Sequence, residues 1–378
     1  MANSQDSRWM RLALAEAARG QGLVEPNPMV GAVIIRHNQV IGIGHHSAYG
    51  GDHAEVAALK HCSETPSGAT IHVTLEPCSH FGKTPPCVDA ILKAGLRRVV
   101  VATRDPFPDV NGNGIRRLQE AGIVVETWPE TSDIALDSAR LNLPFFKKVK
   151  TGRPFVIAKW AMSLDGRIAL PSGDSRWISN PKSRSIVHQI RGRVDAIIVG
   201  IGTALADNPS LTARPPGPRT PVRVVIDPNA ELPLDHHLVQ SSNLYPTWLF
   251  CSHSASRTRF QNLRDHGCQL FEIEPDPSGT ISPNKVLDQL GSAGMTNVLL
   301  EGGSRLLGRF FDDQAIDEVQ VFIAPVLFGG PASFPPIQGR QTLPMEMVTR
   351  LSHIKRTQID DDTLITGLLR QPWIDFPL

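Results

Sequence analysis

Short apolar segments alternate with amphipathic segments through the first half of the chain. Runs rich in β-branched residues predict strands at 30–36, 39–46, 69–78, 97–105 and 123–128. Apolar positions at helical spacing predict helices at 1–20, 53–62, 87–96 and 114–122. Only His37 and Asn38 separate the first two strands, which favours a hairpin. This alternation predicts a layered α/β domain.

The second half shows a similar alternation, without a sequence repeat that relates it to the first. Strands are predicted at 154–162, 194–202, 222–228, 246–252, 297–303, 318–328 and 361–369. Between the halves, residues 141–154 interrupt the pattern with prolines, a glycine and a short basic run. A chain of 378 residues is long for one domain. We therefore predict two α/β domains, 1–147 and 151–378.

The composition mainly excludes classes of protein: nucleic-acid-binding proteins, membrane-spanning proteins and disulfide-stabilised secreted proteins. The formal net charge is +1, so the chain lacks the broad basic field that nucleic-acid binding needs, and we expect no nucleic-acid partner. No apolar run reaches the roughly 18 residues of a membrane span. The N-terminus lacks a signal-peptide pattern, and five cysteines, an odd number, argue against a disulfide scaffold. These features predict a cytoplasmic protein with no membrane partner.

Four residues of the first half have the composition of a catalytic zinc site. His53 and Glu55 stand two apart at the start of a predicted helix, and Cys78 and Cys87 follow a strand and open a second helix. One imidazole and two thiolates supply three zinc ligands and leave a position for water. A glutamate beside the metal can move protons without binding it, which is the zinc-deaminase pattern. The alternative is a chance grouping of buried cysteines and a capping histidine.

The eight residues between the two cysteines, "SHFGKTPP", carry further candidate chemistry. They contain His80, Lys83 and Thr84 in a segment stiffened by glycine and proline. An imidazole, a cation and a hydroxyl together suit a phosphate or a polar heterocycle. Taken alone, Lys83 is equally well read as a solvated surface lysine.

The second half has no G-x-G-x-x-G after a strand, so a Rossmann dinucleotide site is not supported. Instead, two strands run into glycine-rich turns, one before Thr203 and one at Gly302-Gly303. Such turns can approach phosphates, although plain tight turns are more common. Within this region Asp207 could be only a cap, Trp177 only a core residue and Arg191 only a surface base.

Several motifs, taken together and in order, resemble one known family. In the first half these are "PNPMVGAVII", "HAEVAAL", "VTLEPCSHFGKTPPC" and "DPFPDVNGNG". In the second half they are "KWAMSLDGRIA", "SGDSRWIS", "DAIIVGIGTALADNPSLTAR", "LLEGGSRLLGRFF" and "APVLFGG". Nearly the whole chain resembles the bifunctional deaminase/reductases of riboflavin biosynthesis. The resemblance implies a cytidine-deaminase-like three-layer domain followed by a dihydrofolate-reductase-like domain.

The resemblance also implies roles in the first domain. His53, Cys78 and Cys87 are expected to bind Zn²⁺, and Glu55 to shuttle protons. The residues expected to bind the phosphorylated pyrimidine substrate are Asn27, His46, His80, Lys83, Thr84 and Asp105. One departure is Phe107, which stands where the family has an asparagine expected to touch substrate. Because the metal set is intact, an inactive deaminase is not inferred.

In the second domain the resemblance implies binding of NADPH and of a sugar-phosphate substrate. Substrate is expected near Lys159, Ser175, Arg191, Leu211, Arg214 and Glu301. The cofactor is expected along Ala161, Trp177, Thr203, Asp207, Gly303, Ser304, Arg305, Leu306, Leu307, Gly308 and Arg309. Asp207 is also the candidate acid/base or orienting group for the reduction. Arginine suits the phosphate because its planar guanidinium can contact two oxygens.

The implied reactions are two consecutive steps of riboflavin biosynthesis. The first is hydrolytic deamination of 2,5-diamino-6-ribosylamino-4(3H)-pyrimidinone 5′-phosphate, and the second is reduction of the ribosyl group to ribityl by NADPH. Three alternatives remain open at this point. They are a family member with one active half, a nucleic-acid or nucleoside deaminase with a fused binding domain, and a zinc-stapled nucleotide sensor. A homo-oligomer, a dimer or higher, is expected from exposed apolar strands of the second half.

Overall fold

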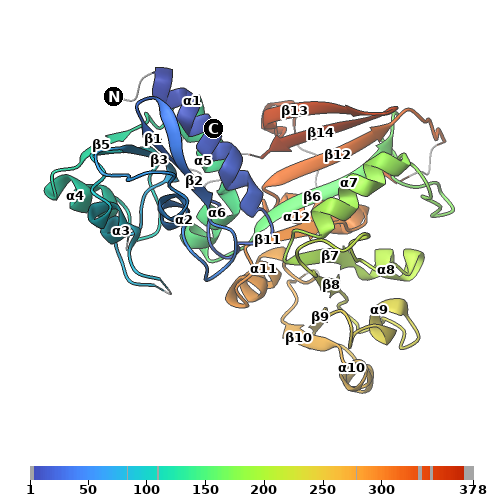
Figure 1. Ribbon diagram of the computed structural model, residues 1–378. Coiled ribbons are helices and arrows are strands. Elements are labelled where there is room, and N and C mark those ends of the chain that lie inside the picture. Colours follow the sequence, from blue (N-terminus) through green and yellow to red (C-terminus); the bar gives the residue numbers. More distant parts are fainter. Residues whose placement is uncertain are drawn as a thin grey trace. The chain divides into compact units, whose positions relative to one another are not determined.

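The computed structural model describes residues 4–82, 84–108, 110–277, 279–330, 334–340 and 344–369. The chain divides into two compact units, the first ending at Thr151 and the second beginning at Gly152 (Figure 1). Each unit is built around its own sheet, of five strands in the first and nine in the second.

The first unit contains a five-stranded sheet with the order β2-β1-β3-β4-β5. Its strands are β1 (Gly31–Arg36), β2 (Gln39–His45), β3 (Thr70–Leu75), β4 (Arg98–Thr103) and β5 (Val124–Thr127). The antiparallel β1–β2 pair turns at His37 and Asn38, which have φ values of 47° and 62°, as a two-residue hairpin turn requires. The β3, β4 and β5 strands are parallel, so the predicted hairpin and strands of this half are confirmed.

Helices cover both faces of this sheet. They are α1 (Ser4–Ala17), α2 (Ala54–Lys60), α3 (Cys87–Lys93), α4 (Asn113–Glu120), α5 (Asp133–Leu141) and α6 (Leu143–Thr151), with the short 3-10 turn η1 (Ala18–Gly20) after α1. One face packs α2, α3 and α4 onto strand residues such as Ile34, Ile71 and Val99. The alternate residues Val33 and Val100 pack against α1 on the opposite face. The period of two along each strand therefore builds the three predicted layers.

The second unit contains a nine-stranded sheet with the order β10-β9-β8-β7-β11-β6-β12-β14-β13. The strands are β6 (Phe155–Ser163), β7 (Ala196–Gly200), β8 (Val222–Ile226), β9 (Thr247–Ser252), β10 (Gln269–Ile273), β11 (Asn297–Leu300), β12 (Glu318–Ala324), β13 (Ser352–Ile359) and β14 (Asp362–Leu368). All neighbours are parallel except the pairs that contain β14. The helices are α7 (Pro181–Arg191), α8 (Ile201–Asp207), α9 (His237–Gln240), α10 (Arg257–Asp265), α11 (Pro283–Ser292) and α12 (Ser304–Asp312), with the 3-10 turn η2 (Met345–Met347).

Three features differ from the sequence-based expectations. Strands β10 and β13 were not predicted, because β10 buries only one of its five side chains and most of the side chains of β13 are exposed and polar. Residues 143–151 form the helix α6 and no open linker, with Pro144 close to the helix start, where proline is tolerated. Trp177 is 71% exposed, so it is not a core residue.

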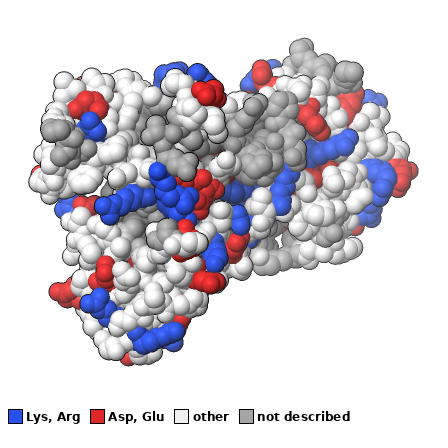
Figure 2. Space-filling model, turned by 180° about the vertical axis from the view of Figure 1, so that it is seen from behind, with Lys and Arg blue, Asp and Glu red and all other residues white. Residues whose placement is uncertain are grey.

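The surface carries charges of both signs. Figure 2 shows Lys and Arg side chains interspersed with Asp and Glu side chains on the face in view, in keeping with the net charge of +1. Among the described residues, no helix is long and apolar enough to cross a membrane.

Candidate functional site

The first unit brings the three predicted zinc ligands together where two helices begin beside the end of β3. His53 is the N-cap of α2, Cys87 is the first residue of α3, and Cys78 follows β3. The His53 Nδ1 atom lies 3.2 Å from the Cys87 Sγ atom and 3.5 Å from the Cys78 Sγ atom. No other group of three or more His, Cys, Asp or Glu side chains with this spacing occurs among the described residues.

The donor set fits zinc. Ideal Zn–S and Zn–N bonds of about 2.3 and 2.0 Å in a tetrahedron place the ligand atoms roughly 3.5 Å apart, which matches these separations. A hydrogen bond from the Cys87 thiol and a smaller contribution from His53 lower the pKa of Cys78 toward the thiolate that binds metal, and the same hydrogen bond raises the pKa of Cys87. One imidazole and two sulfurs leave a fourth position, as catalytic zinc sites do.

Glu55 lies beside this cluster and is buried, with 3% of its surface exposed. It is the second residue of α2, so the short spacing from the N-cap His53 places both side chains at one helix end. Burial, with a smaller contribution from Cys78, raises the pKa of Glu55 to about 7. A carboxyl group with such a pKa can both accept and return a proton near neutral pH.

A cavity of about 240 Å³ opens beside the cluster and collects most of the predicted substrate residues. Those that line it are Asn27, His46, His80, Thr84 and Asp105, together with His53, Glu55 and Cys78. Lys83 lies outside the described residues. The Asn27 amide contacts His46 Nε2 at 3.0 Å, and the other ring nitrogen contacts the Asp52 carbonyl at 2.9 Å. This chain of contacts orients the buried His46 ring.

Other cavity residues were not found by the sequence analysis. Tyr49, Val110 and Phe145 add apolar surface; Val110 lies within the motif "DPFPDVNGNG", whereas Tyr49 and Phe145 belong to no motif quoted above. The Asp105 carboxylate accepts the Phe107 backbone N–H at 2.8 Å, and burial raises the pKa of Asp105 to about 7. Phe107 itself lines the cavity.

Glu76 is a supporting residue that the motif reading also missed. Its carboxylate accepts backbone N–H groups of Gly112, Gly114 and Ile115 at 2.9, 3.0 and 3.2 Å. These amides belong to the start of α4, whose N-cap has no side-chain cap of its own. A Cβ at Gly114 would lie 2.0 Å from the Pro77 carbonyl oxygen. Glu76 therefore binds α4 tightly to the segment that holds Cys78.

We expect Glu76→Ala to weaken zinc binding at a distance from the metal. The change leaves three amide donors without their acceptor, at a cost of about 3 kcal/mol in unfolding free energy. It also frees the segment that carries Cys78, so zinc loss to a chelator should be about tenfold faster or more. Thermal unfolding and chelator-driven zinc release measure both effects. Glu76→Gln keeps an acceptor oxygen and should lie between wild type and Glu76→Ala; wild-type behaviour of Glu76→Ala would contradict the assignment.

The second unit contains a larger cavity, of about 680 Å³, at the ends of parallel strands. The adjacent strands β7 and β11 run into the turns at Gly200 and at Gly302-Gly303, and both turns line this cavity. Helix α12 begins directly after Gly303. A Cβ at Gly303 would lie 2.9 Å from Thr203 Oγ1, so glycine keeps the space between the two turns open. A helix N-terminus beside open backbone fits the phosphates of a dinucleotide such as NADPH.

The structure brings part of the predicted reductase set to this cavity. The lining residues include Lys159, Ala161, Ser175, Thr203, Asp207, Glu301, Gly303, Ser304, Arg305, Leu306 and Arg309. Leu307 is fully buried in the core, and Gly308 packs against the Gln338 carbonyl. Leu211 is buried, whereas Trp177 is exposed and lies beneath the Arg184 guanidinium. Arg214 is exposed and donates to the Thr212 hydroxyl.

Arg191 reaches the cavity through Glu301. Its Nε and Nη2 atoms donate to the two Glu301 oxygens at 2.6 and 2.9 Å, and Lys159 Nζ lies 3.7 Å from the same carboxylate. Although burial alone would raise it, these two cations hold the pKa of Glu301 down to about 2. Burial lowers the pKa of Lys159. Glu301 and Lys159 therefore line the cavity as a carboxylate and a cation, and Arg191 pairs with Glu301 without lining the cavity itself.

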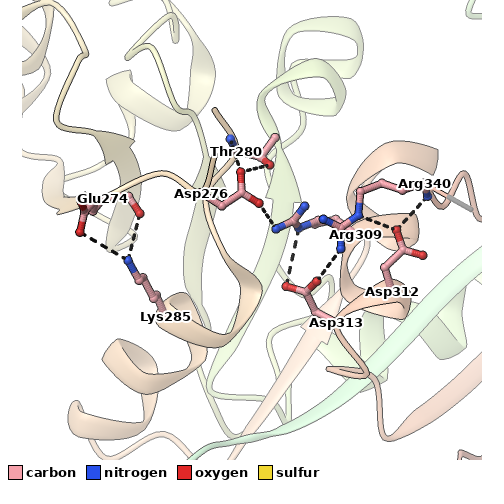
Figure 3. A network of polar contacts seen from close by, with 8 residues as sticks. All are labelled: Glu274, Asp276, Thr280, Lys285, Arg309, Asp312, Asp313 and Arg340. Carbon is pink, nitrogen blue, oxygen red and sulfur yellow. Dashed lines mark hydrogen bonds and ion pairs between the residues drawn. The ribbon is translucent and has the colours of Figure 1, made fainter. Parts of the chain in front are cut away.

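Arg309 differs from the other predicted cofactor residues because its guanidinium already has partners. Figure 3 shows it between Asp276 and Asp313, while the neighbouring Arg340 contacts Asp312. Asp276 also accepts from the Thr280 backbone N–H and hydroxyl, and Thr280 lines the cavity. Arg309 thus ties the cavity-lining segment around Thr280 to α12.

Comparisons with known proteins agree with both sites. A family model described as the RibD C-terminal domain matches residues 154–365, and one described as the cytidine and deoxycytidylate deaminase zinc-binding region matches residues 3–103. The chain is 38% identical to the riboflavin biosynthesis protein RibD of Bacillus amyloliquefaciens over 361 residues, which cover 95% of each chain. It is 37% identical to the Escherichia coli protein of the same name, over 90% of this chain and 92% of that protein.

Solved structures give the same result. The RibD structure from Acinetobacter baumannii, form 1, has 35% identity and a TM-score of 0.84, covering 97% of this chain and 99% of that one. A Thermotoga maritima structure titled a diaminohydroxyphosphoribosylaminopyrimidine deaminase/5-amino-6-(5-phosphoribosylamino)uracil reductase has 33% identity and a TM-score of 0.82, with the same coverage. The chain belongs to the RibD family of bifunctional riboflavin biosynthesis enzymes, which join a zinc-binding deaminase domain to an NADPH-dependent reductase domain.

Proposed function

We propose that this protein carries out two consecutive reactions on one phosphorylated pyrimidine. The first converts 2,5-diamino-6-ribosylamino-4(3H)-pyrimidinone 5′-phosphate into the corresponding uracil, with release of ammonia. The second reduces the ribosyl group to ribityl. The observation that carries the proposal is the His53–Cys78–Cys87 cluster, with the buried Glu55 beside it in a cavity of about 240 Å³.

In the deaminase site, His53, Cys78 and Cys87 are proposed as the residues that hold the metal. When bound, zinc supplies Lewis-acid activation of a water molecule for attack on the amino-bearing carbon. The Glu55 carboxylate accepts a proton from the attacking water and returns it to the departing nitrogen, which leaves as ammonia. Asn27, His46, His80, Thr84 and Asp105, with Lys83, are proposed to orient the pyrimidine and its ribosyl phosphate.

In the reductase site, the glycine turns before Thr203 and α12 are proposed to hold the dinucleotide phosphates. When bound, NADPH supplies a hydride to C1′ of the ribosyl group. The sugar ring opens as its oxygen leaves C1′, and that oxygen must gain a proton. Lys159 is a half-buried ammonium on the cavity wall with a lowered pKa, so it is suited to deliver this proton. Asp207, predicted from the sequence for this role, lines the same cavity and could take it instead.

The assignment of residues to domains follows from these sites. We place the deaminase in residues 1–147 and the reductase in residues 151–378. We also propose a cytoplasmic location, which the five unpaired cysteines favour.

A homo-oligomer, a dimer or higher, is proposed because β13 forms an edge of the nine-stranded sheet and edge strands can pair with a second copy. Sedimentation of the purified chain tests the last point.

The reactions are tested with the zinc-loaded protein and the diamino-pyrimidinone phosphate, with and without NADPH. We expect ammonia release that does not need NADPH, followed by NADPH oxidation when the cofactor is present. Reduction of a supplied uracil intermediate without any ammonia release from the diamino substrate would instead identify a reductase with a zinc scaffold. Release of ammonia from deoxycytidine nucleotides or transfer RNA in preference to this pyrimidine would overturn the proposed substrate.

A further inference from the structure

Phe107 occupies a prominent place in the deaminase cavity. It lies on the loop that follows β4, and its ring lies against the His80 ring with centroids 5.7 Å apart and planes inclined by 34°. Both residues line the cavity, and neither belongs to the metal cluster. The two rings come from loops far apart in the sequence and meet at one wall of the site.

The backbone of Phe107 is already engaged, which leaves the ring as its contribution to the cavity. Its N–H donates to the Asp105 carboxylate at 2.8 Å, and a phenyl ring has no group that donates or accepts a conventional hydrogen bond. What the ring offers is a flat apolar face. Aromatic faces bind other flat rings by offset stacking and gain more than their area alone provides.

His80 supplies an independent sign that a ligand belongs at this wall. Its Nδ1 atom is buried and has no hydrogen-bond partner within the part of the chain that the structure describes. A buried polar atom without a partner is costly, so such atoms usually meet a group that arrives with a ligand. The contact with Phe107 fixes the plane of the imidazole and hence the direction of this nitrogen.

We propose that Phe107 is a specificity-determining residue of the deaminase, and that its ring, packed against His80, stacks on the planar pyrimidine. The neighbouring His80 Nδ1 then makes a hydrogen bond to the edge of the same ring or to one of its substituents. Recognition at this wall therefore depends on the flatness of the heterocycle, and not on an amide hydrogen bond from residue 107. This inference rests on the proposed deaminase function and names how its site selects a substrate.

The test compares Phe107→Tyr, Phe107→Leu and Phe107→Asn with wild type in the full-length, zinc-loaded protein. Tyrosine keeps the ring and should keep KM for ammonia release within about twofold. Leucine has a similar apolar bulk without a flat face, and asparagine replaces the ring by an amide. Both should raise KM by about tenfold while kcat changes by less than about threefold.

Two control readouts separate stacking from a merely structural role. Zinc content should be unchanged in every variant, and reduction of a supplied uracil intermediate by NADPH should proceed at the wild-type rate. A wild-type KM in Phe107→Leu, or a lower KM in Phe107→Asn, would overturn the proposal. Absence of ammonia release by wild type would count against the proposed function instead. In that case calorimetric binding of the aminouracil product decides the inference, which requires weaker binding by Phe107→Leu than by wild type.

Discussion

Replacing Glu55 with glutamine is expected to lower kcat for ammonia release by about 10² to 10⁴-fold. Glutamine keeps the size and the hydrogen-bonding capacity of the side chain, but it cannot accept and return a proton. Glu55 is buried beside the metal cluster, so water cannot easily take over this role. Reduction of a supplied uracil intermediate by NADPH should be unchanged, because the residues of that cavity all belong to the second unit.

Two controls show whether Glu55→Gln still folds and still binds zinc. Zinc content of Glu55→Gln should equal that of wild type, because the ligand atoms belong to His53, Cys78 and Cys87. Glu64→Gln is a matched control, since Glu64 is an exposed glutamate of the same unit outside the cavity lining. Ammonia release by Glu55→Gln within tenfold of wild type, with zinc retained, would remove Glu55 from the proton transfer.

The deaminase site was predictable to the extent that it depends on local sequence. His53 and Glu55 lie at the start of one helix, and Cys87 is the first residue of another. Their positions in the sequence therefore predict where these side chains lie. The same holds for the hairpin at His37 and Asn38, where a two-residue turn determines the pairing. In these cases a short stretch of chain contains both the element and the chemistry.

Residues that act through distant backbone were not predictable in this way. Glu76 accepts hydrogen bonds from backbone N–H groups 36 to 39 positions away. Because nearly every residue type has a backbone N–H group, the sequence does not show which residues donate. Strand β13 has mostly exposed, polar side chains and forms the sheet edge, so it lacks the apolar alternation of the other strands. Arg309 stands in a plausible phosphate motif, yet its partners Asp276 and Asp313 determine what it contacts.

Glu301→Gln is expected to damage the second unit in both stability and activity. The change leaves the Arg191 guanidinium and the Lys159 ammonium without their shared buried carboxylate. Removing one partner of a buried ion pair costs about 3 to 5 kcal/mol in unfolding free energy. NADPH oxidation from the uracil intermediate should fall by about hundredfold, because the two cations lose the group that orients them. Ammonia release serves as the internal control and should be unchanged.

The stability difference between wild type and Glu301→Gln should depend on pH in one direction. A simple packing defect would not show this dependence. The pKa of Glu301 lies at about 2 in the folded protein, below its ordinary value of 4.5. Its contribution to stability is therefore complete above about pH 4.5 and is lost as the pH falls toward 2. The stability difference between wild type and Glu301→Gln should be largest near neutral pH and should narrow on acidification, as followed by urea unfolding at each pH with circular dichroism as the probe.

A double variant separates the two roles of the charged cluster. Arg191→Leu combined with Glu301→Leu removes the main ion pair and leaves no buried charge of that pair unpaired, so it should recover much of the stability that Glu301→Gln loses. Reductase activity should stay low, since Lys159 on the cavity wall remains without the carboxylate. Wild-type activity in the double variant would mean that Glu301 and Arg191 only stabilise the fold. Wild-type stability of Glu301→Gln at neutral pH would mean that the cluster contributes little to it.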